Sequence, residues 1–181
     1  MNLANKVTML RLCLIPVFVI SYLWLPETSV MPVLLFAIAS ATDFVDGHIA
    51  RSRHLVTTFG KFMDPLVDKV LTLSAFILLA ERDRIAGWIV VIIVSRELMI
   101  TGFRTIAASA GVTIAASIWG KYKTTFQMLS ILVLMMERNF LSFLEPLPVA
   151  EGMVALATIF TVLSGVDYLM KNKDVLDLEH I

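Results

Sequence analysis

The chain has 181 residues, a length typical of one domain. Its apolar fraction of 58% and its mean hydropathy of +0.84 exceed those of soluble domains, so the composition favours an integral membrane protein. The 15 basic and 15 acidic side chains cancel, which excludes a global positive field that would attract nucleic acid.

Six apolar blocks follow one another, over residues 7–26, 30–47, 62–80, 85–106, 118–136 and 150–170. Each has roughly 20 residues, which as an α-helix cross about 30 Å of hydrocarbon. The blocks contain charged residues, so this interpretation requires those charges to lie near span ends or to face the bundle interior. We therefore predict one all-α integral membrane domain over residues 1–181, a bundle of six transmembrane helices.

The basic residues are distributed unequally between the predicted loops. If the N-terminus is cytosolic, three of the 15 lysines and arginines fall outside, Arg82, Arg84 and Arg138, and the other twelve fall inside. The positive-inside rule then predicts a multi-pass protein with both termini in the cytosol.

Four aspartates lie at the cytosolic ends of the second and third blocks: Asp43, Asp46, Asp64 and Asp68. The first two are spaced i, i+3 and the last two i, i+4, so each pair shares a helix face. We place Pro65 in the first turn of the third helix, where proline is tolerated. Four facing carboxylates would repel one another unless cations lay between them. Oxygen ligands suit Mg²⁺ or Mn²⁺, and two such ions could clamp a phosphate.

The same region has eight residues at fixed spacing, Asp43-x2-Asp46-Gly47-x2-Ala50-Arg51-x8-Gly60-x3-Asp64-x3-Asp68. This pattern resembles the signature of the CDP-alcohol phosphotransferases at all eight positions. The resemblance implies a six-helix membrane bundle, usually a homodimer, whose four aspartates hold two divalent cations. It also implies that Gly47, Ala50, Arg51 and Gly60 line the CDP site. Asp68 is then the base that takes the proton of the acceptor hydroxyl, while CMP leaves.

Two basic stretches outside the signature bear on the acceptor alcohol, Ser95–Arg104 and Gly120–Gln127. Positive charge beyond the carboxylates suits an acceptor that carries a phosphate, so Arg104, Lys121 and Lys123 are candidate acceptor-phosphate ligands. The alternative is that these three residues are positive-inside anchors. Within the first stretch we expect Arg96 and Glu97 to pair inside the bundle.

Both stretches, and the opening Asn5-x2-Thr8-x2-Arg11, resemble the phosphatidylglycerophosphate synthases of bacteria. The resemblance implies transfer from CDP-diacylglycerol to glycerol 3-phosphate in the bacterial cell membrane, at a site that faces the cytosol. It places Asn5 and Thr8 beside the nucleotide. The alternative for this opening is a helix start with a snorkelling arginine.

Several alternatives stay open. With the same fold and the same donor, the acceptor could instead be serine, inositol phosphate or phosphatidylglycerol. A membrane prenyltransferase also binds metal and pyrophosphate with paired aspartates, but the Gly-x2-Ala-Arg spacing argues against it. A divalent-cation carrier would spread its polar groups across the membrane depth, whereas the acidic residues here concentrate on one side.

Overall fold

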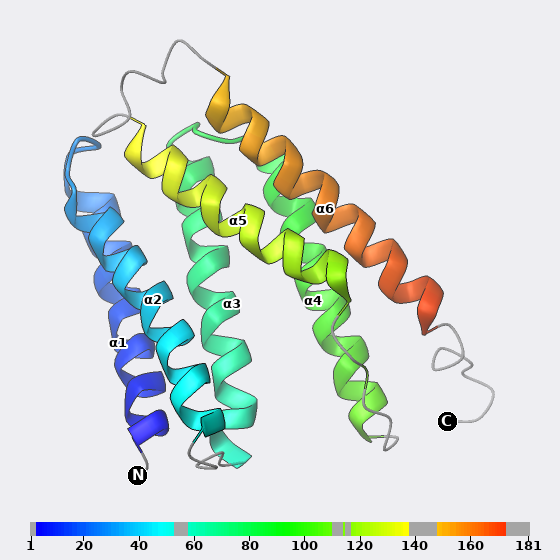
Figure 1. Ribbon diagram of the computed structural model, residues 1–181. Helices are drawn as coiled ribbons and strands as arrows, with labels where there is room; N and C mark the ends of the chain where they lie inside the picture. The colour runs from blue at the N-terminus through cyan, green and yellow to red at the C-terminus, as the bar shows by residue number, and fades with distance from the viewer. Residues whose placement is uncertain (1–2, 53–57, 110–113, 115–116, 138–147, 173–181) are drawn as a thin grey trace.

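A computed structural model shows an all-helical chain (Figure 1). The structure describes residues 3–52, 58–109, 114, 117–137 and 148–172. Within these ranges only the backbone is described for residues 3–6, 43–52, 58–62, 64–65 and 109. The helices are α1 (Leu3–Trp24), α2 (Met31–Ser52), α3 (Thr58–Glu81), α4 (Gly87–Ser109), α5 (Ile118–Met136) and α6 (Val149–Lys171). The described residues form six helices, as predicted, and each helix overlaps one of the six apolar blocks.

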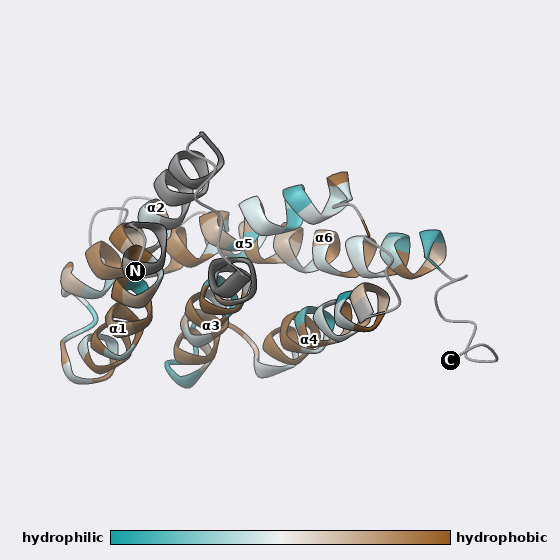
Figure 2. Ribbon diagram, turned by 90° about the horizontal axis from the view of Figure 1, so that it is seen from below, coloured by the Kyte–Doolittle hydropathy of each residue, from teal (hydrophilic) through white to brown (hydrophobic). Residues whose placement is uncertain are grey.

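The helices form two layers of three. One layer holds α1, α3 and α4, and the other holds α2, α5 and α6, as the view along the bundle shows (Figure 2). Contacts join the layers at α1–α2, α3–α5 and α4–α6, and α3 touches four other helices. Helix α3, which carries two of the four signature aspartates, therefore occupies the centre of the bundle.

Membrane character is visible in the outward-facing side chains. The helices have 19 to 24 residues, or roughly 29 to 36 Å at 1.5 Å per residue. Val7–Trp24 and Val149–Lys171 are long and apolar enough to cross a membrane, and only 28% of each is buried. On α6 an exposed apolar stripe runs through Leu156, Ile159, Leu163, Val166 and Met170, which are 39% to 70% exposed. Outward apolar surface of this kind is typical of a membrane protein.

The continuous apolar core fills one half of the bundle. Its largest members include Phe18, Phe36, Phe76, Leu79 and Ile93, and the rings of the first two lie 5.8 Å apart. These residues belong to the C-terminal halves of α1 and α3 and the N-terminal halves of α2 and α4. The other half of the bundle, where the aspartate signature lies, is left for polar groups.

Two arginines join the helix ends on the core side. Arg82 donates to the backbone oxygens of Tyr22 and of Leu25, the latter at 3.1 Å, and its guanidinium lies 4.5 Å from the ring centre of Tyr22. Arg84 forms an ion pair with Glu137 at the end of α5. The guanidinium of Arg82 thus satisfies carbonyls that the last turn of α1 leaves unpaired. Both predicted outer arginines in the described region are used structurally.

The predicted start of the third helix is wrong. Helix α3 begins at Thr58, so Pro65 lies beyond the first turn rather than within it. A proline inside a helix removes one hydrogen bond at a cost of about 3 kcal/mol. This penalty is local, and the contacts of α3 with four neighbouring helices outweigh it.

Candidate active site

Asp68 of α3 pairs with a buried arginine of α1. The Nη1 atom of Arg11 lies 3.0 Å from Oδ1 of Asp68, with Arg11 only 1% exposed and the Asp68 side chain 39% exposed. Thr8, one turn before Arg11, is also buried, so both residues face the bundle interior. The alternative interpretation of Arg11 as a snorkelling side chain is therefore wrong, because the guanidinium turns inward to the carboxylate.

The remaining signature residues can be placed by their helices alone. Helix α2 carries Asp43 and Asp46, and α3 carries Asp64 and Asp68, so the predicted helical spacing holds in both pairs. Helices α2 and α3 are in contact. The side chains of the first three aspartates lie outside the described residues.

The other predicted nucleotide-site residues are placed in the same way. Gly47, Ala50 and Arg51 belong to α2, Gly60 belongs to α3, and Asn5 belongs to α1. Their side chains also lie outside the described set. Among the side chains that are described, no group of three or more metal-ligating residues occurs. The four carboxylates still fit two hard divalent cations, because helical backbone presents each pair on one face and every donor is oxygen.

A cavity of about 200 Å³ opens beside Asp68. It is lined by Asp68, Lys69, Thr72, Leu73, Glu97, Lys123, Thr124 and Gln127. These residues come from α3, α4 and α5, so the cavity lies where the two layers meet. Seven of the eight lining residues are polar or charged, which suits a small water-soluble molecule that can use their polar groups.

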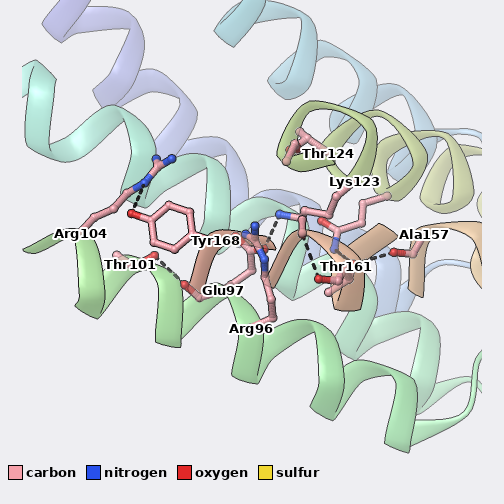
Figure 3. A network of polar contacts seen from close by, with 12 residues as sticks. Arg96, Glu97, Thr101, Arg104, Lys123, Thr124, Ala157, Thr161 and Tyr168 are labelled. Atoms are coloured by element: carbon pink, nitrogen blue, oxygen red, sulfur yellow. Dashed lines mark hydrogen bonds and ion pairs between the residues drawn. The ribbon is translucent and has the colours of Figure 1, made fainter. Parts of the chain in front are cut away.

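A buried ion pair forms the wall opposite Asp68. Glu97 of α4 accepts from the ammonium of Lys123 and, at 3.1 Å, from Arg96 Nη1 (Figure 3). Lys123 is 6% exposed, so its interpretation as a surface anchor is wrong. The predicted pairing of Arg96 with Glu97 is confirmed. The two cations share one carboxylate, which leaves this wall with an excess of positive charge.

The other two candidate acceptor ligands lie elsewhere. Lys121 is exposed and does not line the cavity, because side chains two positions apart on a helix point about 200° apart. Arg104 donates through Nε to the hydroxyl of Tyr168 at 3.3 Å, with its guanidinium 5.5 Å from that ring's centre. Figure 3 shows this contact beyond Thr101, further along α4 than Glu97.

A polar network between α5 and α6 was not foreseen. Gln127 donates to Thr161 at 3.0 Å, Ser130 donates to the backbone oxygen of Gln127, and Ser164 donates to that of Thr161. All four side chains are buried. The sequence does contain a pattern that could have predicted this network, because Lys123, Gln127 and Ser130 repeat at i, i+4 and i+7 on one face of α5.

Basic groups outnumber carboxylates among the described side chains around the cavity. The carboxylates are Asp68 and Glu97, and the basic groups near them are Arg11, Lys69, Arg96 and Lys123. These basic groups can attract an anionic group into the cleft. The arrangement therefore suits a substrate that carries a phosphate.

A larger cavity, of about 660 Å³, lies at the opposite end of the bundle between α4 and α6. Its walls include Trp88, Ile89, Val154 and Ile159, with Arg84 and Glu137 at the rim. None of the eight signature residues lines it. Size alone therefore does not mark the active site.

Comparison with known proteins places this geometry in a family. The CDP-alcohol phosphatidyltransferase family model matches residues 1–163. The chain is similar to the CDP-diacylglycerol–glycerol-3-phosphate 3-phosphatidyltransferase of Bacillus subtilis, with 40% identity covering 97% of each chain. The enzyme of the same name from Haemophilus influenzae is 36% identical, over 95% of this chain and 94% of its own. A probable phosphatidylglycerophosphate synthase of Mycobacterium tuberculosis is 38% identical, over 94% of this chain and 81% of its own. The chain belongs to the CDP-alcohol phosphatidyltransferase family.

Proposed function

We propose that this chain transfers the phosphatidyl group of CDP-diacylglycerol to glycerol 3-phosphate, giving phosphatidylglycerophosphate and CMP. The observation that carries the proposal is the cavity lined both by Asp68 and by the Lys123–Glu97 ion pair, which Arg96 joins through Glu97. The first group suits a hydroxyl that must lose a proton, and the second suits a phosphate. The names of relatives 36% to 40% identical agree with this pair of substrates.

The donor is proposed to bind at the signature. Asp43, Asp46, Asp64 and Asp68 would hold two divalent ions, Mg²⁺ or Mn²⁺, which when bound neutralise charge on the pyrophosphate. Gly47, Ala50, Arg51 and Gly60, with Asn5 and Thr8 of α1, would line the CDP moiety. The inward position of Thr8 supports a place for it in the site.

The transfer step is carried by Asp68. The acceptor hydroxyl oxygen forms a bond to the phosphorus that bears the diacylglycerol, and the bond from this phosphorus to the CMP oxygen breaks. The hydroxyl proton passes to the Asp68 carboxylate, which Arg11 holds in place at 3.0 Å. CMP leaves with the electron pair of the broken bond.

The acceptor phosphate is proposed to lie against Lys123, with Lys69 on the adjacent wall. Glu97 positions Lys123 through their ion pair. Lys121, which is exposed at the start of α5, and Arg104 would attract the anionic acceptor from water before it reaches the cavity. Their effect is therefore expected on the rate of acceptor capture and at low salt.

The site is proposed to open to the cytosol from a six-span protein of the bacterial cell membrane, with both termini cytosolic. The length of all six helices and the excess of basic residues at the signature end support this orientation. The lipid donor then stays in the bilayer while glycerol 3-phosphate arrives from water. A homodimer, which is usual in the family, is part of the proposal.

The test is CMP release by purified protein in detergent with CDP-diacylglycerol and Mg²⁺ or Mn²⁺. Glycerol 3-phosphate, serine, inositol phosphate and phosphatidylglycerol are added singly, with Asp68→Asn as the inactive control. Release with glycerol 3-phosphate, lost in the variant, is expected. Release with another acceptor alone would overturn the acceptor assignment, and no release with any would overturn the transferase.

A further inference from the structure

Gln127 is a buried amide on the wall of the cavity beside Asp68. It is 2% exposed and lies one helical turn after Lys123 on the same face of α5. Its Nε2 atom is 3.0 Å from Oγ1 of Thr161 on α6. The sequence interpretation assigned it no role.

The network fixes which way this amide points. The Thr161 hydroxyl has one proton, which it donates to the backbone oxygen of Ala157 at 2.6 Å (Figure 3). Its oxygen can therefore only accept from Gln127, so the amide nitrogen must face α6. The amide oxygen Oε1 then points away from Thr161. Within the part of the chain that the structure describes, this oxygen has no hydrogen-bond partner.

The threonine hydroxyls that line the cavity already donate their protons to backbone oxygens. Thr72 donates to the backbone oxygen of Asp68, and Thr124 donates to that of Gly120. Lys123 and Arg96 both donate to Glu97, and among the described contacts none runs from a lysine or arginine to Gln127. Gln127 lines the cavity, so its Oε1 is available there to a donor that the substrate brings.

We propose that Oε1 of Gln127 accepts a hydrogen bond from the second hydroxyl of the acceptor, the hydroxyl that does not attack. This inference rests on the proposed function and deepens it by naming the residue that recognises a glycerol phosphate. The cavity of about 200 Å³ leaves room for a small polyol phosphate.

Three contacts then hold the acceptor. Its phosphate lies against Lys123, its attacking hydroxyl lies at Asp68, and its secondary hydroxyl lies at Gln127. Two contacts cannot distinguish the enantiomers of glycerol 3-phosphate, whereas three can. Gln127 is thus assigned both the preference for a diol and the preference for one enantiomer, and Thr161 is assigned the positioning of its amide.

The experiment compares glycerol 3-phosphate with 3-hydroxypropyl phosphate, which keeps the phosphate and a primary hydroxyl and lacks the secondary one. For wild-type protein we expect kcat/KM for CMP release to favour glycerol 3-phosphate by roughly 10- to 100-fold. In Gln127→Met this preference should fall to within about threefold, through loss on glycerol 3-phosphate with little change on the analogue. The preference between enantiomers should fall with it.

Variants around the amide separate recognition from packing. Thr161→Val removes the hydroxyl that orients the amide and should reduce the preference, whereas Thr161→Ser should keep it. Ser130→Ala alters the same buried network without lining the cavity, so it should leave the preference at the wild-type value.

Equal losses on both acceptors in Gln127→Met, or no preference in the wild type, would overturn the role of Gln127. Failure of the proposed function looks different, because wild-type protein would then release CMP with neither glycerol phosphate nor its analogue. In that case this inference falls with it. Retained preference in both Gln127→Met and Thr161→Val would overturn the inference while leaving the proposed function intact.

Discussion

Arg11 and Asp68 lie 57 residues apart in sequence and form an ion pair of 3.0 Å between α1 and α3. The arginine is almost completely buried, while the carboxylate remains open to the cavity. Arg11 therefore holds the Asp68 carboxylate in position without blocking it from the cavity. In the proposed mechanism, the position of the base is therefore set by a residue outside the eight-residue signature.

Replacement of Arg11 should lower the rate of the transfer step. Arg11→Met removes the contact that orients Asp68, and misplacement of a reacting group by about 1 Å costs on the order of 100-fold. Arg11→Lys keeps the charge but loses the planar guanidinium, so its loss should be smaller, about tenfold. The measurement is kcat for CMP release at saturating substrates, with folding checked by thermal unfolding in detergent.

Arg82 supplies a matched control for Arg11. It is also an arginine that ties α1 to the end of α3, but it lies at the core end of the bundle and contacts backbone oxygens. Arg82→Met should lower the unfolding temperature and leave kcat of the folded protein unchanged. If both variants lost kcat equally, the effect of Arg11 would be one of general stability.

Variants of the Glu97–Lys123 pair should separate the stability of the protein from its binding of the acceptor. Glu97→Gln leaves the buried ammonium of Lys123 beside Arg96 without a carboxylate, a loss of about 3–5 kcal/mol for a broken buried pair. The double variant Glu97→Gln/Lys123→Met removes the stranded charge, so it should recover much of the unfolding temperature. Its KM for glycerol 3-phosphate should stay raised, because the phosphate contact is gone.

Thermal unfolding and acceptor KM, measured on the two single variants and the double, test this pair. A double variant no more stable than Glu97→Gln would contradict the stranded-charge explanation. A double variant with wild-type KM would remove Lys123 from the acceptor site.

Apolar periodicity and length were sufficient to predict the helices. Blocks such as 118–136 and 150–170 match α5 and α6 within one residue at each end. The start of α3 was predicted wrongly because the preference of proline for the first turn reflects local sequence alone. Helix α3 also contacts four other helices, and the local rule does not include these contacts. Asp167 and Lys171 form an ion pair of 2.7 Å, a contact that i, i+4 spacing within one helix makes local information.

Partners across helices were harder to foresee. Sequence spacing identified Lys123 as a basic residue near the site but could not place its ammonium against Glu97, 26 residues away. The contacts of Arg11 and Gln127 were not predicted for the same reason, since their partners Asp68 and Thr161 lie on other helices. Helix spacing tells which residues share a face, whereas the neighbour of that face depends on packing.

Removal of divalent cations should abolish activity reversibly. A chelator is expected to stop CMP release, and added Mg²⁺ or Mn²⁺ to restore it, because the four aspartates cannot hold the pyrophosphate without cations. Asp43→Asn should raise the half-saturating Mn²⁺ concentration by about tenfold or more. Mn²⁺ binding followed by electron paramagnetic resonance gives the same comparison without turnover. Full activity in the chelated protein would contradict the metal assignment.

Labelling of single cysteines should reveal the orientation in the membrane. Glu27 lies between α1 and α2 and Ala108 in the last turn of α4, segments at opposite ends of the bundle (Figure 1). The chain has one cysteine, Cys13, so Cys13→Ser provides the background. A membrane-impermeant maleimide added to intact spheroplasts should label Glu27→Cys and should reach Ala108→Cys only after lysis. Each variant must keep CMP release, so that a misfolded population is not counted. The reverse pattern would place the signature outside the cell, where neither glycerol 3-phosphate nor CDP-diacylglycerol is made available by cytosolic synthesis, and would overturn the proposed orientation.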